Sequence, residues 1–91
     1  MESRTMLLLK IEVRGVTVPV DLKTTRHDGT ALKRHAIVAE AKHALERVLG
    51  RVVDPLVVPE GTSIWVNNTL HVTPCRGLTW RVARWVAEQV I

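Results

Sequence analysis

The sequence predicts an α+β domain with the element order β-β-α-β-β-α, in which an antiparallel sheet of about four strands carries both helices on one face. Three observations predict this fold. Residues 6–23 alternate apolar and polar side chains, residues 31–49 repeat apolar side chains at helical spacing, and residues 63–73 alternate again before a final apolar segment. We expect a single domain over residues 1–91, because a chain this short forms one core.

Residues 6–23 are expected to form a β-hairpin. Its apolar residues alternate with polar ones, and they are Leu7, Leu9, Ile11, Val13, Val16, Val18, Val20 and Leu22. A two-residue turn at Arg14-Gly15 places all of them on one face of the hairpin. In this register Pro19 lies opposite Lys10 and its missing N–H group would point outward, so the second strand is expected to be an edge of the sheet.

A long helix is expected over about residues 31–49. Its apolar stripe consists of Ile37, Val38, Ala41, Ala44, Leu45, Val48 and Leu49. Charged and histidine side chains occupy the other side, and the two alanines allow the stripe to approach a sheet closely. Asp28 or Thr30 is the expected N-cap, and Gly50 is suited to the position that follows the helix.

After this helix, residues 51–62 are punctuated by Pro55 and Pro59 and predict a connector with a short strand at 56–58. A second hairpin is expected around Asn67-Asn68, and the sequence allows two registers for it.

A two-residue turn at the asparagines places Trp65 beside Leu70. A three-residue loop leaves Trp65 beside His71 on the outer face and collects four apolar side chains on the inner face. Those four are Ile64, Val66, Leu70 and Val72. The second register has the better apolar pattern, although Thr69 is poorly suited to the left-handed backbone position that such a loop requires.

The last segment predicts a helix from Thr79 onward, with a strand over residues 78–83 as the alternative. Arg81, Arg84 and Glu88 form a narrow polar strip on this helix, and Trp80 and Trp85 lie on its two borders. The remaining positions form a broad apolar arc, made of Leu78, Val82, Ala83, Val86, Ala87 and Val90.

The balance of charges permits an acidic partner. The chain carries 13 lysines and arginines against nine acidic residues, a formal net charge of +4 at pH 7. Several cations cluster near the two predicted helices, and they are Arg26, Lys33, Arg34, Arg76, Arg81 and Arg84. We therefore predict a small non-catalytic basic domain that binds the phosphate backbone of RNA or DNA through these residues.

The alternative hypothesis is a homo-oligomeric interaction or structural module that uses the last helix and an open sheet edge. A helix that covers one face of a sheet needs about 100° of apolar surface, and the last segment offers about twice that arc. The first helix or a second copy must cover the excess. The expected interface residues are Trp80, Val82, Trp85, Val86 and Val90.

Catalytic, metal and cofactor chemistry find no supporting motif, and no small-molecule substrate is evident. The histidines at 27, 35 and 43 lie eight residues apart, too far along a helix to share one metal ion. The single cysteine, Cys75, excludes an internal disulfide. We expect a cytoplasmic protein without a membrane span, because the apolar run near the start is too short for either a span or a signal peptide. The arginine-rich usage fits a thermophile or a GC-rich genome.

Several short motifs follow one another along the chain: VTVPVDL at 16–22, a basic pair leading the long helix, VVP at 57–59, IW at 64–65 and LHVTPCRGLTWRV at 70–82. In this order the chain resembles the large-subunit ribosomal protein thirty-one family of archaea and eukaryotes. The resemblance implies RNA binding, with Lys33, Arg34 and Arg76 as phosphate contacts.

The chain also departs from that family. TTRHDGTALKR stands where the family has a dense Lys/Arg run, and TPCRG stands in place of its Pro-Pro-Arg-Arg region. The first strand is additional, and the family ends in strands where a helix is expected here.

Overall fold

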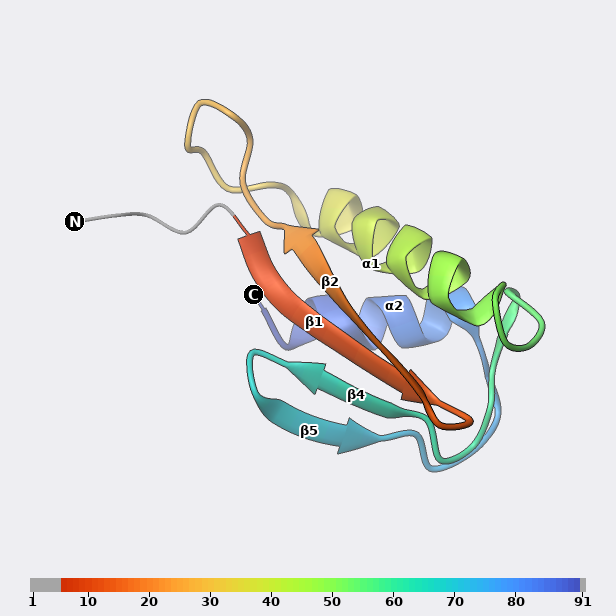
Figure 1. Ribbon diagram of the computed structural model, residues 1–91. Coiled ribbons are helices and arrows are strands. Elements are labelled where there is room, and N and C mark those ends of the chain that lie inside the picture. Colours follow the sequence, from red (N-terminus) through yellow and green to blue (C-terminus); the bar gives the residue numbers. More distant parts are fainter. Residues whose placement is uncertain (1–5, 91) are drawn as a thin grey trace.

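The structure is a computed structural model that describes residues 6–90, with side chains from residue 8 onward (Figure 1). Its elements are β1 (Met6–Val13), β2 (Val16–Lys23), α1 (Arg34–Leu49), β3 (Val57–Val58), β4 (Ser63–Val66), β5 (Thr69–Val72), β6 (Gly77–Leu78) and α2 (Thr79–Glu88). The predicted α+β fold is confirmed. The short strands β3 and β6 pair with each other outside the main sheet.

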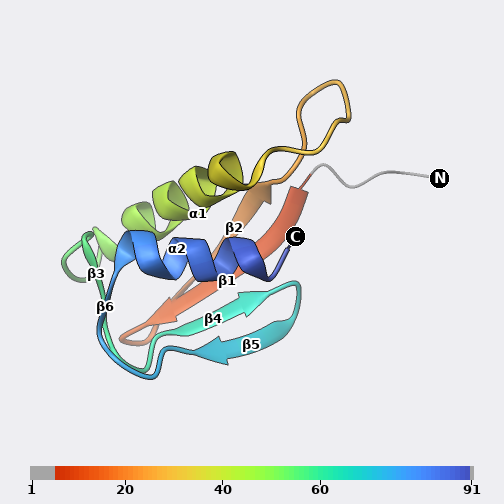
Figure 2. The same cartoon turned by 180° about the vertical axis from the view of Figure 1, so that it is seen from behind.

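The main sheet has four antiparallel strands in the order β2-β1-β4-β5. Figures 1 and 2 show α1 and α2 lying side by side on one face of this sheet and running in opposite directions. Over the other face of the sheet, no helix lies among the described residues. Neither of the two helices in the described residues is long and apolar enough to cross a membrane.

The core lies between the sheet and the helix pair. The inner face of the sheet contributes Leu9, Ile11, Val13, Leu22, Ile64 and Val66. The apolar stripe predicted for the first helix faces them, and all of its members are buried except Val38, which is partly buried. The alanines in this stripe have no exposed surface, because they lie where α1 packs closely against its neighbours.

The first hairpin has the predicted register. Arg14 and Gly15 form its two-residue turn with φ angles of 49° and 80°, the left-handed conformation that the tight hairpin turn requires. Pro19 lies opposite Lys10, and β2 is an edge strand as expected.

The second hairpin has the two-residue turn, so the better-patterned register with a three-residue loop is wrong. Asn67 and Asn68 form the turn with φ angles of 54° and 72°, and Trp65 is paired with Leu70. Asparagine tolerates left-handed backbone better than threonine does, so turn chemistry outweighs the apolar pattern. As a result, Leu70 and Val72 lie on the uncovered face and are 51% and 54% exposed.

The first helix begins at Arg34, three residues later than predicted, and neither Asp28 nor Thr30 is its N-cap. These two residues instead close their own turn. The backbone N–H and the hydroxyl of Thr30 donate to a carboxylate oxygen of Asp28 at 3.0 and 2.7 Å. The hydrogen bonds from Thr30, that of the side chain above all, lower the pKa of Asp28. Gly50 ends the helix in right-handed rather than left-handed conformation, with φ of −62°.

The start of α2 is fixed by the connector that follows α1. Thr79 is buried, its hydroxyl donates to the carbonyl oxygen of Pro55 at 2.7 Å, and its backbone N–H donates to that of Leu56 at 3.1 Å. The predicted helix from Thr79 is confirmed. Of the strand alternative over residues 78–83, only Leu78 lies in a strand, because β6 (Gly77–Leu78) pairs with β3 and the helix follows at once.

Candidate nucleic-acid interface

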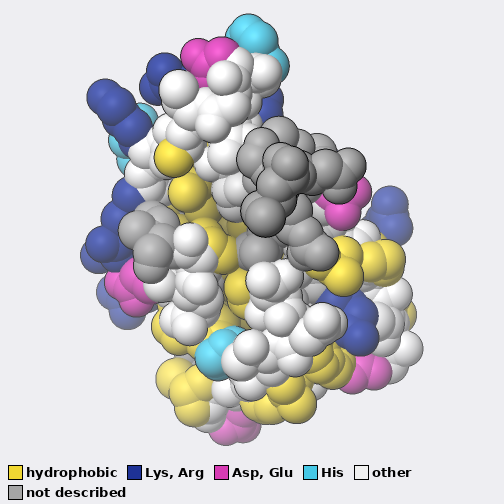
Figure 3. Space-filling model, turned by 90° about the vertical axis from the view of Figure 1, so that its left-hand side faces the viewer, with side chains coloured by type: hydrophobic (Ala, Val, Ile, Leu, Met, Phe, Trp, Pro, Cys, Tyr) yellow, Lys and Arg dark blue, Asp and Glu magenta, His cyan; other side chains and the backbone are white. Residues whose placement is uncertain are grey.

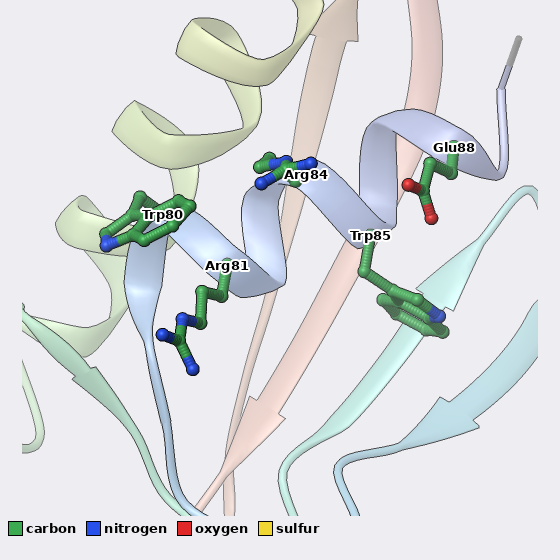
Figure 4. A pocket seen from close by; sticks show the side chains of 5 residues that line it. All are labelled: Trp80, Arg81, Arg84, Trp85 and Glu88. Carbon is green, nitrogen blue, oxygen red and sulfur yellow. The ribbon is translucent and has the colours of Figure 1, made fainter.

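The candidate interface is the outward side of α2. Four residues, Thr79, Ala83, Val86 and Ala87, are buried and fix the rotation of this helix against the core. The polar strip therefore faces solvent, and Figure 4 shows Arg81 and Arg84 leaving the helix between the two tryptophans, with Glu88 beyond Trp85. A shallow hollow of about 340 Å³ is lined by Trp80, Arg81, Arg84, Trp85 and Glu88.

Trp80 is the most exposed indole of this surface, with 42% of its area accessible. The guanidinium carbons of Arg81 and Arg84 lie 5.5 and 5.8 Å from the centre of its ring. Such cation–π contacts at exposed sites contribute about 0.5–1 kcal/mol each. They hold two arginines over the ring of a tryptophan that stays partly accessible to solvent.

Trp85 lies on the other border of the strip and points the other way. Arg81 does not stack on Trp85, because both arginines lie against Trp80. Trp85 instead meets His71 of β5 edge to face, with ring centroids 4.5 Å apart. Trp85 is partly buried, so it is an edge of the core rather than an open stacking surface.

The start of α1 adds a third arginine to the surface. Because the helices are antiparallel, Arg34 lies beside the end of α2 and donates to the carboxylate of Glu88 at 2.7 Å. Arg34 and Arg84 also line one hollow of about 430 Å³ together with His35 and Val38. In the described part of the chain, Arg34 is the only one of the surface's arginines with a carboxylate partner.

The other predicted phosphate contacts lie elsewhere. Arg76 is on the loop after β5 and shares a hollow with Arg81 beneath α2. Lys33 immediately precedes α1 and is exposed. Arg26 lies on the loop that projects beyond the start of α1 (Figure 1). The structure thus brings Arg34, Arg81 and Arg84 together on one surface and leaves Arg26 outside it.

Figure 3 shows Lys and Arg side chains gathered along the helix side of the molecule, and hydrophobic side chains exposed at the end of the sheet that holds β5. The cationic side is not uniformly basic, since acidic groups lie among the cations. The charge distribution is therefore a modest basic surface and not a dense phosphate-binding patch.

The residues expected at an interface with another chain have mixed environments. Trp80 is exposed, and Val82, Trp85 and Val90 are partly buried. Val86 is fully buried in the chain's own core, so it has no surface left to offer a second copy. The broad apolar arc of α2 is covered from two sides, because the helix packs against α1 and its Trp85 contacts His71 of the sheet (Figure 2).

The uncovered face of the sheet carries a feature that the sequence pattern missed. Lys10 lies over the ring of Trp65, with its Nζ 4.3 Å from the ring centre. Leu8, Leu70 and Val72 are exposed on the same face. These exposed apolar side chains could have been predicted only from the two-residue turn at the asparagines. The turn determines on which face of the sheet the side chains of Leu70 and Val72 lie.

Within the described residues, no three His, Cys, Asp or Glu side chains lie close enough together to hold a metal ion. Cys75 is exposed on the loop between β5 and β6. No model of a known protein family matches the chain, and neither a curated protein nor a solved structure does. The resemblance of residues 16–82 to the ribosomal family stays a prediction, because these comparisons do not test it.

Proposed function

We propose that the protein is a non-catalytic cytoplasmic domain that binds single-stranded nucleic acid on the outward surface of α2 and the start of α1. The observation that carries this proposal is the exposed indole of Trp80 with Arg81 and Arg84 beside it. An unpaired base stacks on an open aromatic ring, which contributes about 1–3 kcal/mol per base. Arginines next to that ring are placed to contact the adjoining phosphates.

Single strands fit this surface better than a duplex does. Stacking on Trp80 requires a base whose face is free, and the bases of a duplex are stacked on one another. The hollow at Trp80 is shallow and lies along a helix, so it follows a backbone and does not enclose one base. Recognition of this kind depends on stacking and charge, so we expect weak preference for sequence.

The number of cations sets the expected salt dependence. Arg81 and Arg84 have no carboxylate partner in the described residues, and Arg34 shares its charge with Glu88. Each phosphate contact to a single strand contributes a slope of about −0.7 to the plot of log binding constant against log salt concentration. With two to three contacts, we expect a slope between about −1.4 and about −2.1.

Fluorescence anisotropy with a labelled mixed-sequence single-stranded RNA tests the proposal, titrated from low to physiological salt. Arg81→Ala with Arg84→Ala is expected to flatten the salt slope, and Trp80→Ala is expected to weaken binding about tenfold with the slope unchanged. The matched control is Lys23→Ala with Arg26→Ala, which removes the same charge from outside the surface.

Absence of binding at low salt would refute the proposal. An equal loss in the control pair would mean that only net charge matters, and this result would also refute the assignment to α2. Duplex DNA and a structured RNA belong in the same series. Tighter binding of the structured RNA than of the single strand would favour the ribosomal resemblance over stacking on Trp80.

A further inference from the structure

We propose that the open edge of β5, together with the groove between β5 and α2, binds an extended acidic segment of a partner protein, which adds to the sheet as a fifth strand. This proposal does not rest on nucleic-acid binding. It uses the backbone edge of β5 and the groove side of α2, and of the residues that line the hollow at Trp80 only Arg81 and Trp85 also border this groove.

The two edges of the sheet differ in what their backbones offer. On β2, Pro19 occupies a position whose N–H would point outward, so this edge lacks a donor at its centre. On β5, His71 is paired with Ile64 and Thr69 with Val66. In an antiparallel ladder the residues between such pairs direct their N–H and C=O groups away from the neighbouring strand.

The residues between these pairs on β5 are Leu70 and Val72. The alternation continues past the strand, because the N–H of Thr73 donates to the carbonyl oxygen of Thr62 at 3.0 Å. Two successive outward positions therefore present a free donor and a free acceptor each. These are the groups that an added strand uses when it extends a sheet.

The groove beside this edge is the roomiest of the hollows described, at about 500 Å³. Its walls are His71 and Val72 of β5, the loop 73–77, and Arg81, Val82 and Trp85 of α2. Figure 4 shows the indole of Trp85 directed from α2 toward the sheet, where its edge-to-face contact with His71 holds it in place. Apolar side chains form much of the lining, and Pro74 and Cys75 also belong to it.

An added strand would find apolar contacts on both of its faces. Side chains alternate across a strand, so every second residue of the partner would enter the groove against Val82 and Trp85. The residues between them would lie on the uncovered face of the sheet beside Leu70 and Val72, which are both more than half exposed. The partner segment should therefore carry apolar side chains on both faces over its central residues.

The positive charge of the groove favours a partner segment with acidic residues. Arg76 and Arg81 line it, and no aspartate or glutamate does. Neither arginine has an ion pair with another described residue. Arg76 also borders a smaller hollow with Arg14 and Asp54. These two guanidinium groups have no carboxylate partner and lie beside residues 73–77. They favour a carboxylate at the end of the partner segment that would lie next to these residues.

A second copy of the chain fits this site less well than a foreign segment does. Its own β5 and the flanking residues 67–74 contain no acidic side chain. Pairing of two β5 strands would satisfy the backbone but would leave the arginines of both grooves without a counter-charge. We therefore commit to an acidic, apolar segment of another protein as the occupant.

Backbone amide shifts in two-dimensional NMR test the proposal, with a capped peptide of alternating valine and threonine that ends in two glutamates as the probe. We expect the peptide to shift the amides of Leu70, Val72 and the loop 73–77. Val72→Pro is expected to weaken binding about tenfold, because it removes one outward N–H group and leaves the pairing with β4 intact. Thr17→Pro is the matched control, since it places proline at an outward position of β2, two residues from Pro19.

A second pair of measurements tests the proposal even if Val72→Pro unfolds the chain. Arg76→Glu should weaken the binding of the peptide that ends in two glutamates. The same change should strengthen the binding of a peptide that ends in two lysines. Shifts confined to other surfaces, or equal binding of both peptides to the unmodified chain, would overturn the proposal. A concentration-dependent dimer that Val72→Pro abolishes would assign the edge to a second copy and would also overturn it.

Nucleic-acid binding and peptide binding should be lost separately. Trp80→Ala should affect only the nucleic acid, and Val72→Pro only the peptide.

Discussion

His71 on β5 and Trp85 on α2 meet edge to face, with ring centroids 4.5 Å apart and an angle of 86° between the ring planes. This contact joins the edge strand of the sheet to the helix above it. With Trp85 packed inward, the other border tryptophan, Trp80, faces solvent. One aromatic pair thus separates the two surfaces of α2.

The coupling between these two rings should be measurable. Aromatic pairs contribute about 0.5–1.5 kcal/mol beyond the burial of their surface. We expect a double-mutant cycle of His71→Ala and Trp85→Ala in urea unfolding to give a coupling free energy in this range. A coupling near zero would mean that Trp85 is held by the core alone. Trp80→Ala in the same assay should change stability by less than Trp85→Ala does.

Glu88→Gln should strengthen the binding of single-stranded RNA. The carboxylate of Glu88 is held by Arg34 at 2.7 Å, with about half of each side chain exposed, so its removal frees a cation and removes a charge that repels phosphate. We expect an increase of a few-fold at low salt and a steeper salt slope, with unfolding changed by less than about 1 kcal/mol. Glu60→Gln is the control, since this exposed residue lies in the connector after β3. An equal gain in the control would attribute the effect to net charge.

The register of the second hairpin predicts a contrast between two residues on adjacent strands. Ile64 is fully buried, and Leu70 is 51% exposed. Ile64→Ala should therefore lower the free energy of unfolding by about 2–5 kcal/mol. Leu70→Ala should change it by about 0.5 kcal/mol or less. If Leu70→Ala were as costly as Ile64→Ala, the three-residue loop would be the true register.

The turn at Asp28 predicts a dependence on pH. Hydrogen bonds from the side chain and the backbone of Thr30 lower the pKa of Asp28 below its ordinary value of 3.8. Because the pKa is lower in the folded chain, the carboxylate stabilises the turn fully above its unfolded pKa, and this stabilisation is lost as the pH falls through the folded pKa. NMR titration should give a higher pKa for Asp28 in Thr30→Ala than in the unmodified chain. Equal values in the two proteins would contradict the role of the hydroxyl.

The sequence predicts most of the fold where pattern and turn chemistry agree. In the first hairpin, the turn at Arg14-Gly15 and the alternation of apolar residues select the same register, and the structure has it. In the second hairpin they disagree. The adjacent asparagines supply two left-handed positions cheaply, and this gain prevails although it exposes Leu70 and Val72. The pattern of apolar residues alone does not show whether the favourable turn conformation or the burial of Leu70 and Val72 contributes more to the free energy of folding.

The candidate site was only partly predictable. Helical spacing places Trp80, Arg81 and Arg84 on one surface, because residues three and four apart share a face. The approach of Arg34 to Glu88 joins residues 54 positions apart and depends on how the helices pack. The open edge of β5 likewise follows from strand order, which hairpin patterns do not specify.

The proline in β2 has a consequence for how large any assembly of this protein can become. Since one lateral side of the sheet is closed at its centre and the other is open, each molecule has a valency of one for strand addition. A single partner strand caps it, and two molecules joined at their open sides would turn their closed sides outward. Assembly by strand addition therefore ends after one partner strand has been added. The open edge of β5 does not lead to fibrils built from many copies of the chain.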